Sequence, residues 1–450
     1  MDKKLLLKLV AIAVMSLLLL VPLALIEDQI RQRSSRQDEV QRGIASSAAG
    51  PQTLTGPVLL IHYRERLEPE MTEDPATGRL RSIPRFAEQR FHLPAQSLRL
   101  TGEARVETRQ RGIYQARLYH LDLAVAGRFV LPAHLGLDSK RTLVSAEATL
   151  LLGVSDPRGV DNDPAVNLSG TRHRFSTPKS SAVQGDALAG ERLAIPLGAL
   201  ALDGPTTLDF DFPLQLTGTE RLAIAPTGEA NTIAIKSDWR HPSFGGRFLP
   251  RERVVGDDGF TARWEISHLA RSFPNTLAAA KGGPSPEVLD IQFIDPVNVY
   301  LQSERAVKYG ILFIALTFAG FFLSEVLRRS PIHPLQYLLV GLALAVFFLL
   351  LIALSEHLPF VAAYAIAASA CIALIGSYLT AALGGRRQGF AFAAALAGLY
   401  GVLYGVLLSE DNSLLMGSVL LFLALAAIML ATRRIDWYQV GSVVAARPAQ

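Results

Sequence analysis

The sequence predicts a membrane protein in which six transmembrane α-helices carry one large, mainly-β domain between the first and second spans. Charged residues are concentrated in residues 27–305, whereas residues 309–431 contain few, and those lie between apolar runs. Hydrocarbon penalises each charge by several kcal/mol, so a membrane protein must separate its residues in this way. Within residues 27–305, apolar residues alternate with polar ones, as is typical of β-strands.

Six segments are apolar over the roughly 20 residues that a helix needs to cross the hydrocarbon core. Their runs are too continuous for the strands of a membrane β-barrel. The first is expected to remain as an uncleaved signal anchor, because it is long and lacks a small-x-small cleavage motif. The six predicted spans are residues 5–26, 307–327, 335–354, 360–382, 389–408 and 413–431.

The short connections between the spans predict the orientation of the chain. Basic residues cluster before the first span and after the second, fourth and sixth spans, whereas the two other connections are acidic. The positive-inside rule therefore places both termini in the cytoplasm and residues 27–305 on the outer side of the membrane. The predicted parts are a signal anchor (1–26), an external mainly-β domain (27–305), a five-helix bundle (306–434) and a short cytoplasmic tail (435–450).

Glu356 and His357 are the only Asp, Glu, Lys, Arg or His residues between Leu335 and Leu383. They could form a buried proton-handling pair or a hydrated external turn. The turn is favoured, because charges at the ends of helices are ordinary. The pair also lacks the H-E-x-x-H spacing of a zinc protease.

The remaining polar features of the spans point to packing. Lys308 and Glu325 lie near span ends, and the lack of ionisable residues at the midplane weighs against an ion-coupled transporter. Gly398, Gly401 and Gly405 in the fifth span allow close helix contact. Packing within the bundle is favoured over dimerisation, because neighbouring helices are already tethered.

The block between the first two spans predicts a helical stalk followed by antiparallel sheets. Residues 27–49 favour a helix that ends at Gly50-Pro51. Strands with one wet face follow, and turn signals between them indicate a β-sandwich-like domain of one or two packed units. A short helix and a loop are expected over 267–290. The alternating segments are LDLAVAGRFV, LDFDFPLQL, NTIAIKSDW and FTARWEI.

The sequence contains no recognisable catalytic or cofactor-binding motif. Phosphate-binding, dinucleotide-binding and nucleophile-elbow motifs are absent, and the nine histidines are scattered. A single cysteine, Cys371, excludes an internal disulfide and a multi-thiolate metal site. No basic run with interleaved aromatic residues indicates nucleic-acid binding. No catalytic residue, metal ligand or cofactor is therefore predicted.

Two polar loops remain as candidates. The acidic cluster Asp156, Asp161, Asn162 and Asp163 does not match an EF-hand, and a solvated loop is favoured over a Ca²⁺ site. The segment SDWRHPSFGGRFLP, residues 237–250, combines aromatic and basic residues on a loop. It is either a binding surface or, as favoured, a packed crossover whose aromatic residues cap the sandwich. Its candidate interaction residues are Trp239, Arg240, His241, Phe244, Arg247 and Phe248.

Long stretches of the chain resemble the CreD family of bacterial inner-membrane proteins. The similarity extends over the full length and follows the same order along the chain. The stretches that carry it are SDWRHPSFGGRFLP, GFTARWEISHLAR, KYGILFIALTFAGFFLSEVL, RRSPIHPLQYLLVGLALAVFFLLLIALSEH and RRIDWY.

The resemblance implies a role in cell-envelope integrity, expression under the Cre two-component system, and links to colicin tolerance and β-lactam responses. The favoured reading is a non-enzymatic structural or interaction component that works with envelope proteins or lipids. The alternatives are an enzyme acting on peptidoglycan or lipid, and a transporter or flippase with a periplasmic receptor domain. The family supplies no established catalytic residues to transfer.

Overall fold

The computed structural model describes residues 3–73, 80–136, 142–177, 191–200, 204–270, 287–294, 298–328, 332–382, 385–408 and 413–433. The chain divides into two compact units. The helical unit contains Met1–Asp38 and Val297–Gln450, and the β unit contains Glu39–Pro296. Residues 27–38 and 298–305, which the sequence assigned to the outer domain, thus group with the helices.

The helical unit begins with α1 (Lys3–Leu18) and α2 (Leu20–Ser47), which form a nearly continuous helix. The break at Leu19 lies three residues before Pro22. A proline inside a helix cannot donate a backbone hydrogen bond, and its ring crowds the carbonyl four residues earlier. The helix α2 continues into the charged segment that was predicted as a stalk and ends just before Gly50-Pro51.

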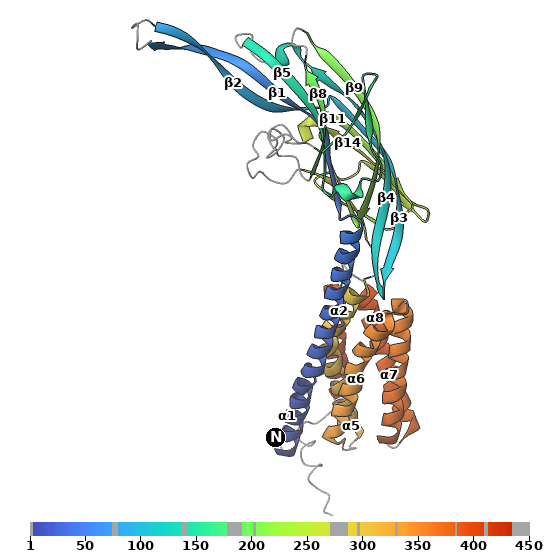
Figure 1. The fold of residues 1–450 in the computed structure, drawn as a ribbon. Helices are drawn as coiled ribbons and strands as arrows, with labels where there is room; N and C mark the ends of the chain where they lie inside the picture. The colour runs from blue at the N-terminus through green and yellow to red at the C-terminus, as the bar shows by residue number, and fades with distance from the viewer. Residues whose placement is uncertain are drawn as a thin grey trace, which may run out of the picture. The chain divides into compact units, whose positions relative to one another are not determined.

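After the β unit, the chain becomes helical again at Val299, ahead of the second predicted span, and the helices from Gly310 onward coincide with the later predicted spans (Figure 1). Local sequence fixes two of their starts: the Asn298 side chain accepts hydrogen bonds from the first turn of α4, and His333 with Gln336 forms a capping box before α6. The helices are α4 (Val299–Lys308), α5 (Gly310–Arg328), α6 (Pro334–Ser355), α7 (Phe360–Ala382), α8 (Arg386–Leu408) and α9 (Ser413–Thr432).

Four described helices are long and apolar enough to cross a membrane: the N-terminal helix over Val10–Ser47, and α6, α7 and α8. The pair α4 and α5, bent by 43° around Tyr309, would make a fifth. The segment of the sixth predicted span is helical as α9 but does not meet this test over its described residues. Large apolar side chains such as Phe390 and Phe422 are exposed on these helices, as expected of lipid-facing positions.

The β unit is built from two sheets. The first has seven described strands in the order β12-β15-β10-β1-β5-β8, with β2 also paired to β1. Its strands are β1 (Gln52–Glu73), β2 (Leu80–Pro94), β5 (Thr142–Val154), β8 (Glu191–Ala199), β10 (Arg221–Ala225), β12 (Pro242–Gly246) and β15 (Leu289–Phe293).

The second sheet has eight described strands in the order β13-β14-β11-β3-β4-β9-β6-β7. Only the tip of its long β3–β4 hairpin extends beyond the pairing with β11 and β9 (Figure 1). Its strands are β3 (Ser97–Arg111), β4 (Tyr114–Leu131), β6 (Ala165–Leu168), β7 (Thr171–Arg174), β9 (Thr206–Thr219), β11 (Ala230–Ser237), β13 (Glu252–Gly256) and β14 (Gly259–Ser267).

The two sheets share one hydrophobic core. Leu150 and Leu222 contribute from the first sheet, and Leu100, Phe212 and Trp264 contribute from the second, all of them at most 2% exposed. The alternating residues of LDFDFPLQL point their apolar side chains inward along β9, as predicted. The mainly-β domain predicted from the sequence is therefore confirmed.

The predicted strand direction needs one correction, and two other predicted segments fall partly or wholly outside the described residues. The sheets are not wholly antiparallel, because β1 pairs with β10 and β3 pairs with β11 in parallel. These partners are far apart in the sequence, where hairpin signals give no information. In the segment 267–290, where a short helix and a loop were expected, the described residues contain one 3-10 turn, η3 (His268–Ala270), and residues 271–286 lie outside them. The predicted cytoplasmic tail, 435–450, also lies outside them.

Candidate functional site

The segment 237–250 connects the two sheets on one side of the sandwich. It leaves β11 in the second sheet at Ser237 and forms β12, which pairs with β15 at the edge of the first sheet. It then returns to the second sheet, where β13 forms the edge next to β14. The segment is therefore a crossover that contains a short strand.

The aromatic residues of this crossover pack against the core. The Phe244 ring lies edge-on to Phe260 and Trp264, with ring centroids 5.4 Å and 5.8 Å away. The Trp264 indole N–H donates to the Phe248 carbonyl over 3.1 Å. The Trp239 indole N–H donates to the carbonyl of His241 over 3.0 Å. These contacts fix the path of the chain across the end of the sandwich.

The polar candidates of the same segment point outward. Arg240, His241 and Arg247 are exposed, and Arg247 forms an ion pair with Glu287 at 3.0 Å. The structure thus divides the six candidate residues into three half-buried aromatic residues and three exposed polar ones. Recognition by this segment would therefore use its exposed polar residues, two of which are arginines.

The acidic loop 156–163 holds together backbone segments of the β unit. The Asp156 carboxylate accepts hydrogen bonds from the Gly50 amide at 3.0 Å and from the Arg158 guanidinium. Hydrogen bonds from the Arg158 guanidinium, and from the backbone amides of Gly50 and Arg158, lower the pKa of Asp156 to about 2. Asn162 bonds to the backbone of Pro213 and Gln215. Among the described residues, no group of His, Cys, Asp and Glu has a metal-site arrangement.

Glu356, at the C-terminal end of α6, is not the hydrated turn residue expected from the sequence. Its side chain is only 9% exposed. The Tyr300 hydroxyl donates to its Oε1 over 3.3 Å, and Arg33 Nε lies 3.6 Å from the same oxygen. Glu356 therefore joins α2, α4 and α6. His357, by contrast, is exposed, as predicted for the turn.

A second ion pair lies at the opposite end of α6. Lys8 of α1 pairs with Glu325 of α5 and also donates to the Ile332 carbonyl at 2.8 Å. The Tyr337 hydroxyl of α6 donates to the other Glu325 oxygen over 3.2 Å. The Lys8 and Glu325 side chains are only 20% and 14% exposed. This cluster ties the N-terminal helix to the C-terminal helices.

The positions of Lys8 and Glu325 in the sequence indicate that they can pair. Lys8 lies near the start of the first predicted span, and Glu325 near the end of the second. Opposite charges at the same predicted depth are favourable partners, because an unpaired charge near hydrocarbon is costly. Arg33 and Glu356 are likewise opposite charges, each a few residues beyond the end of a predicted span.

Between the two ion pairs, the helices are joined by buried aromatic residues. The Tyr364 hydroxyl donates to the Tyr400 carbonyl over 2.7 Å, and the Tyr400 hydroxyl lies 3.0 Å from the Cys371 sulfur. The Phe347 ring contacts both tyrosines. These hydroxyls therefore hold α7 and α8 together at a depth where no charge is present in the described helices.

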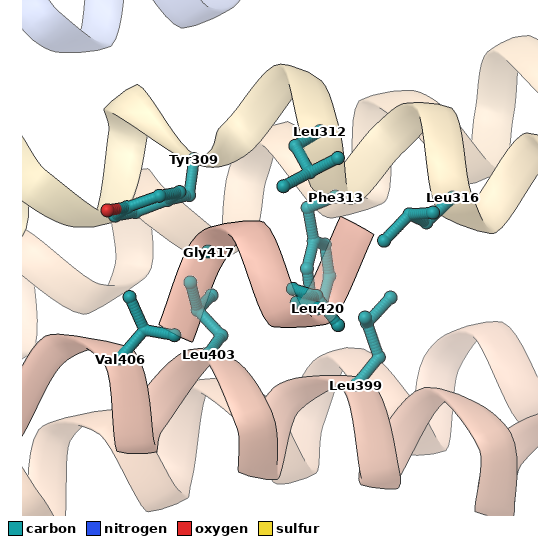
Figure 2. A pocket seen from close by; sticks show the side chains of 9 residues that line it. All are labelled: Tyr309, Leu312, Phe313, Leu316, Leu399, Leu403, Val406, Gly417 and Leu420. Atoms are coloured by element: carbon teal, nitrogen blue, oxygen red, sulfur yellow. The ribbon is translucent and has the colours of Figure 1, made fainter. Parts of the chain in front are cut away.

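A small apolar pocket lies between α5, α8 and α9 (Figure 2). Its free space is about 10 Å³, close to the room that one water molecule needs. Figure 2 shows the Tyr309 ring at one end and the side chains of Phe313 and Leu403 within the lining. Apart from Tyr309, every residue of the lining is apolar or glycine, and the space is too small for a substrate, so this pocket is a packing gap.

Of the three glycines of α8 that the sequence singled out, Gly398, Gly401 and Gly405, two have no close neighbour. A Cβ atom added at Gly398 or Gly401 would meet no heavy atom within 4 Å among the described contacts. Gly405 alone has a neighbour, the Met416 methyl at 3.7 Å. Buried residues such as Tyr400 and Leu403 form the inward face of α8 instead. The expectation of close packing at Gly398 and Gly401 within the bundle is therefore wrong.

Comparison with known proteins identifies the family. The family model described as Inner membrane protein CreD matches residues 4–438. The curated Inner membrane protein CreD of Escherichia coli (strain K12) is 36% identical over 424 residues, which cover 94% of this chain and 91% of that protein.

A solved structure of a putative nutrient binding protein from Legionella pneumophila aligns with 50% of this chain and 77% of its own. Its identity is 7% and its TM-score is 0.25, values too low to support a statement about fold or function. The match over nearly the whole chain, in contrast, confirms the resemblance read from the sequence motifs. This chain belongs to the CreD family of inner membrane proteins.

Proposed function

We propose that this protein is a non-enzymatic component of the bacterial inner membrane that contributes to envelope integrity. The observation that carries the proposal is the pairing of charges within the helical unit. Lys8 with Glu325 and Arg33 with Glu356 join the N-terminal helix to the C-terminal helices. Such ion pairs suit a fixed anchor for a large domain better than a proton relay, whose carboxylates must gain and lose protons.

The proposed orientation follows from the basic connections between the spans. Both termini lie in the cytoplasm, the chain crosses the membrane six times, and the β unit lies in the periplasm. The positive-inside rule supports this arrangement. Membership of the CreD family supports the inner membrane as the location and the envelope as the place of action. We extend the family's Cre-dependent expression and link to colicin tolerance to this protein on the same ground.

The β unit is proposed to act through its surface. Its best-defined charged contacts connect neighbouring strands, such as Arg128 with Asp209 at 2.5 Å. The exposed residues Arg240, His241 and Arg247 form a basic outer surface on the 237–250 crossover. An acidic partner in the envelope, either a protein or a lipid headgroup, fits that surface by charge.

The proposal is tested in a strain that lacks this protein. Detergent sensitivity and colicin tolerance are expected to change in that strain and to return to normal with the wild-type chain. The double variant Arg240→Ala/Arg247→Ala is expected to remain as abundant as the wild type, since exposed substitutions change stability by about 0.5 kcal/mol or less. It should nevertheless fail to restore the envelope.

The aromatic variant Phe244→Ala provides the matched control within the same segment. It should lower the free energy of unfolding by about 3–5 kcal/mol, as expected for a packed aromatic side chain, and reduce protein abundance. Full restoration by the arginine variant would remove the crossover from the proposed function. An unchanged envelope in the deletion strain would contradict the proposed function itself.

A further inference from the structure

Strand β13 is an unusually uncovered edge of the second sheet. Residues 251–258, which contain the whole strand and its turn, are all exposed. Val254 is 72% exposed and Val255 is 48% exposed, although they point to opposite faces of the strand. Leu249, just before the strand, is 68% exposed. Apolar side chains on both faces of a free edge favour pairing with another strand.

Three other edge strands of the two sheets, β7, β8 and β12, carry the usual protection. Strand β7, at the opposite edge of the same sheet, has the sequence Thr-Arg-His-Arg. In the first sheet, β12 begins with Pro242 and ends with two glycines, and β8 contains Pro196. Charge and proline both discourage pairing with a foreign strand. Strand β13 also carries charges, at Glu252 and Arg253, but it has no proline and exposes two valines.

The register of the β13–β14 hairpin shows which backbone groups are available. Gly256 pairs with Gly259 across the two-residue turn Asp257–Asp258. In such a hairpin, the closing pair is hydrogen-bonded and bonding then alternates along the strand. Val254 therefore bonds to β14, whereas the N–H and C=O groups of Arg253 and Val255 point away from the sheet. These groups form the free edge.

We propose that β13 pairs in antiparallel fashion with β13 of a second copy of this chain. The symmetric register is centred on Val254, so that Val254 lies opposite Val254 of the second copy. Arg253 then lies opposite Val255 of the second copy, and their outward backbone groups form the new hydrogen bonds. This register also places Arg251 opposite Asp257 of the second copy. The two free edges would become the centre of one sheet that spans two molecules.

The charges of the strand support a second copy as the occupant. Arg251 is exposed and extends from the strand toward its own Glu265, so that it can also reach a second carboxylate. The turn residue Asp257 is exposed. In the dimer, Asp257 of each copy would face Arg251 of the other, so the contact would occur twice. The pairing is self-complementary in both shape and charge, as a twofold interface requires. This inference is independent of the proposed envelope role, since it concerns assembly alone.

Disulfide crosslinking tests the register with single-residue resolution. Cys371 is the only cysteine of the chain, so Cys371→Ala gives a cysteine-free background. In that background, Val254→Cys should form a disulfide-linked dimer under mild oxidation, both in membranes and with the full chain purified in detergent. The non-hydrogen-bonded position brings the two Cα atoms to about 4.5 Å, which is within the range of a disulfide.

Glu252→Cys is the matched control, because residue 252 lies on the same face of the same strand. In the proposed register, the two copies of residue 252 are four positions out of alignment, about 14 Å apart, and should not crosslink. Adding Val255→Pro to Val254→Cys removes one outward N–H and should slow dimer formation about tenfold. Val255→Thr keeps that N–H and should not slow dimer formation. Neither substitution should alter the melting temperature greatly.

The inference fails if Val254→Cys gives no dimer, or crosslinks no faster than Glu252→Cys. A crosslink from residue 254 to a different protein, without the homodimer, would also overturn the assignment of a second copy. None of these outcomes bears on the envelope phenotype of the deletion strain, so the two proposals can fail separately.

Discussion

Replacing Lys8 by methionine is expected to lower the stability of the helical unit by about 3–5 kcal/mol, because Glu325 would keep its charge in a largely buried position without its partner. Glu325→Leu should cost a similar amount by leaving the Lys8 ammonium unpaired. The measurement is the melting temperature of the full chain in detergent, together with protein abundance in membranes.

The double variant Lys8→Met/Glu325→Leu distinguishes an ion pair from two unrelated packing effects. With both charges removed, no charge is left stranded, and the loss should be clearly smaller than the sum of the two single losses. Lys3 and Lys4 remain at the N-terminus and preserve the orientation signal. Strictly additive losses would show that Lys8 and Glu325 do not stabilise each other in the membrane.

Glu356→Ala is expected to destabilise the same unit by about 1–3 kcal/mol, since it removes the acceptor shared by Tyr300 and Arg33. The neighbouring variant His357→Ala should change stability by about 0.5 kcal/mol or less, because this side chain is exposed. The pair is a matched control, with adjacent residues in one turn. Equal effects from the two substitutions would contradict the assignment of Glu356 to an interhelical contact.

The sequence predicted the positions of the helices well, because the physics that forms them is local. A run of about 20 apolar residues is helical in lipid whatever surrounds it. The starts and ends of α6 and α7 agree with the predicted spans within one residue. The bend at Tyr309 and the break at Leu19 divide two of the predicted segments, and hydropathy does not report either one.

The β domain was predictable in class and less so in topology. Alternation along β9 and β14 identified the buried face of each strand. The parallel partners β10 and β11 depend on contacts between distant segments, which no local pattern encodes. Strand β15 was missed, because it is only five residues long and follows a segment rich in Ala, Gly and Pro.

The candidate sites depended most on tertiary contacts. Glu356 looked hydrated from its position at a turn, and only the approach of Arg33 and Tyr300 from other helices shows that it is buried. From the sequence, a packed crossover was favoured for the aromatic residues of segment 237–250, with a binding surface as the alternative. Their orientation toward Phe260 and Trp264 comes from the crossing of the chain between two sheets, which sequence spacing cannot reveal.

The most direct test of the central claim, a periplasmic β domain carried by six membrane spans, is a set of reporter fusions along the chain. A reporter that is active only outside the cytoplasm should work when it is fused after residues 150, 357 and 411. It should fail after residues 330, 387 and 436, where the basic connections and the C-terminal tail are expected to face the cytoplasm. The predicted result is therefore activity at the first three positions and none at the other three, and an inactive reporter after residue 150 would contradict a periplasmic β domain.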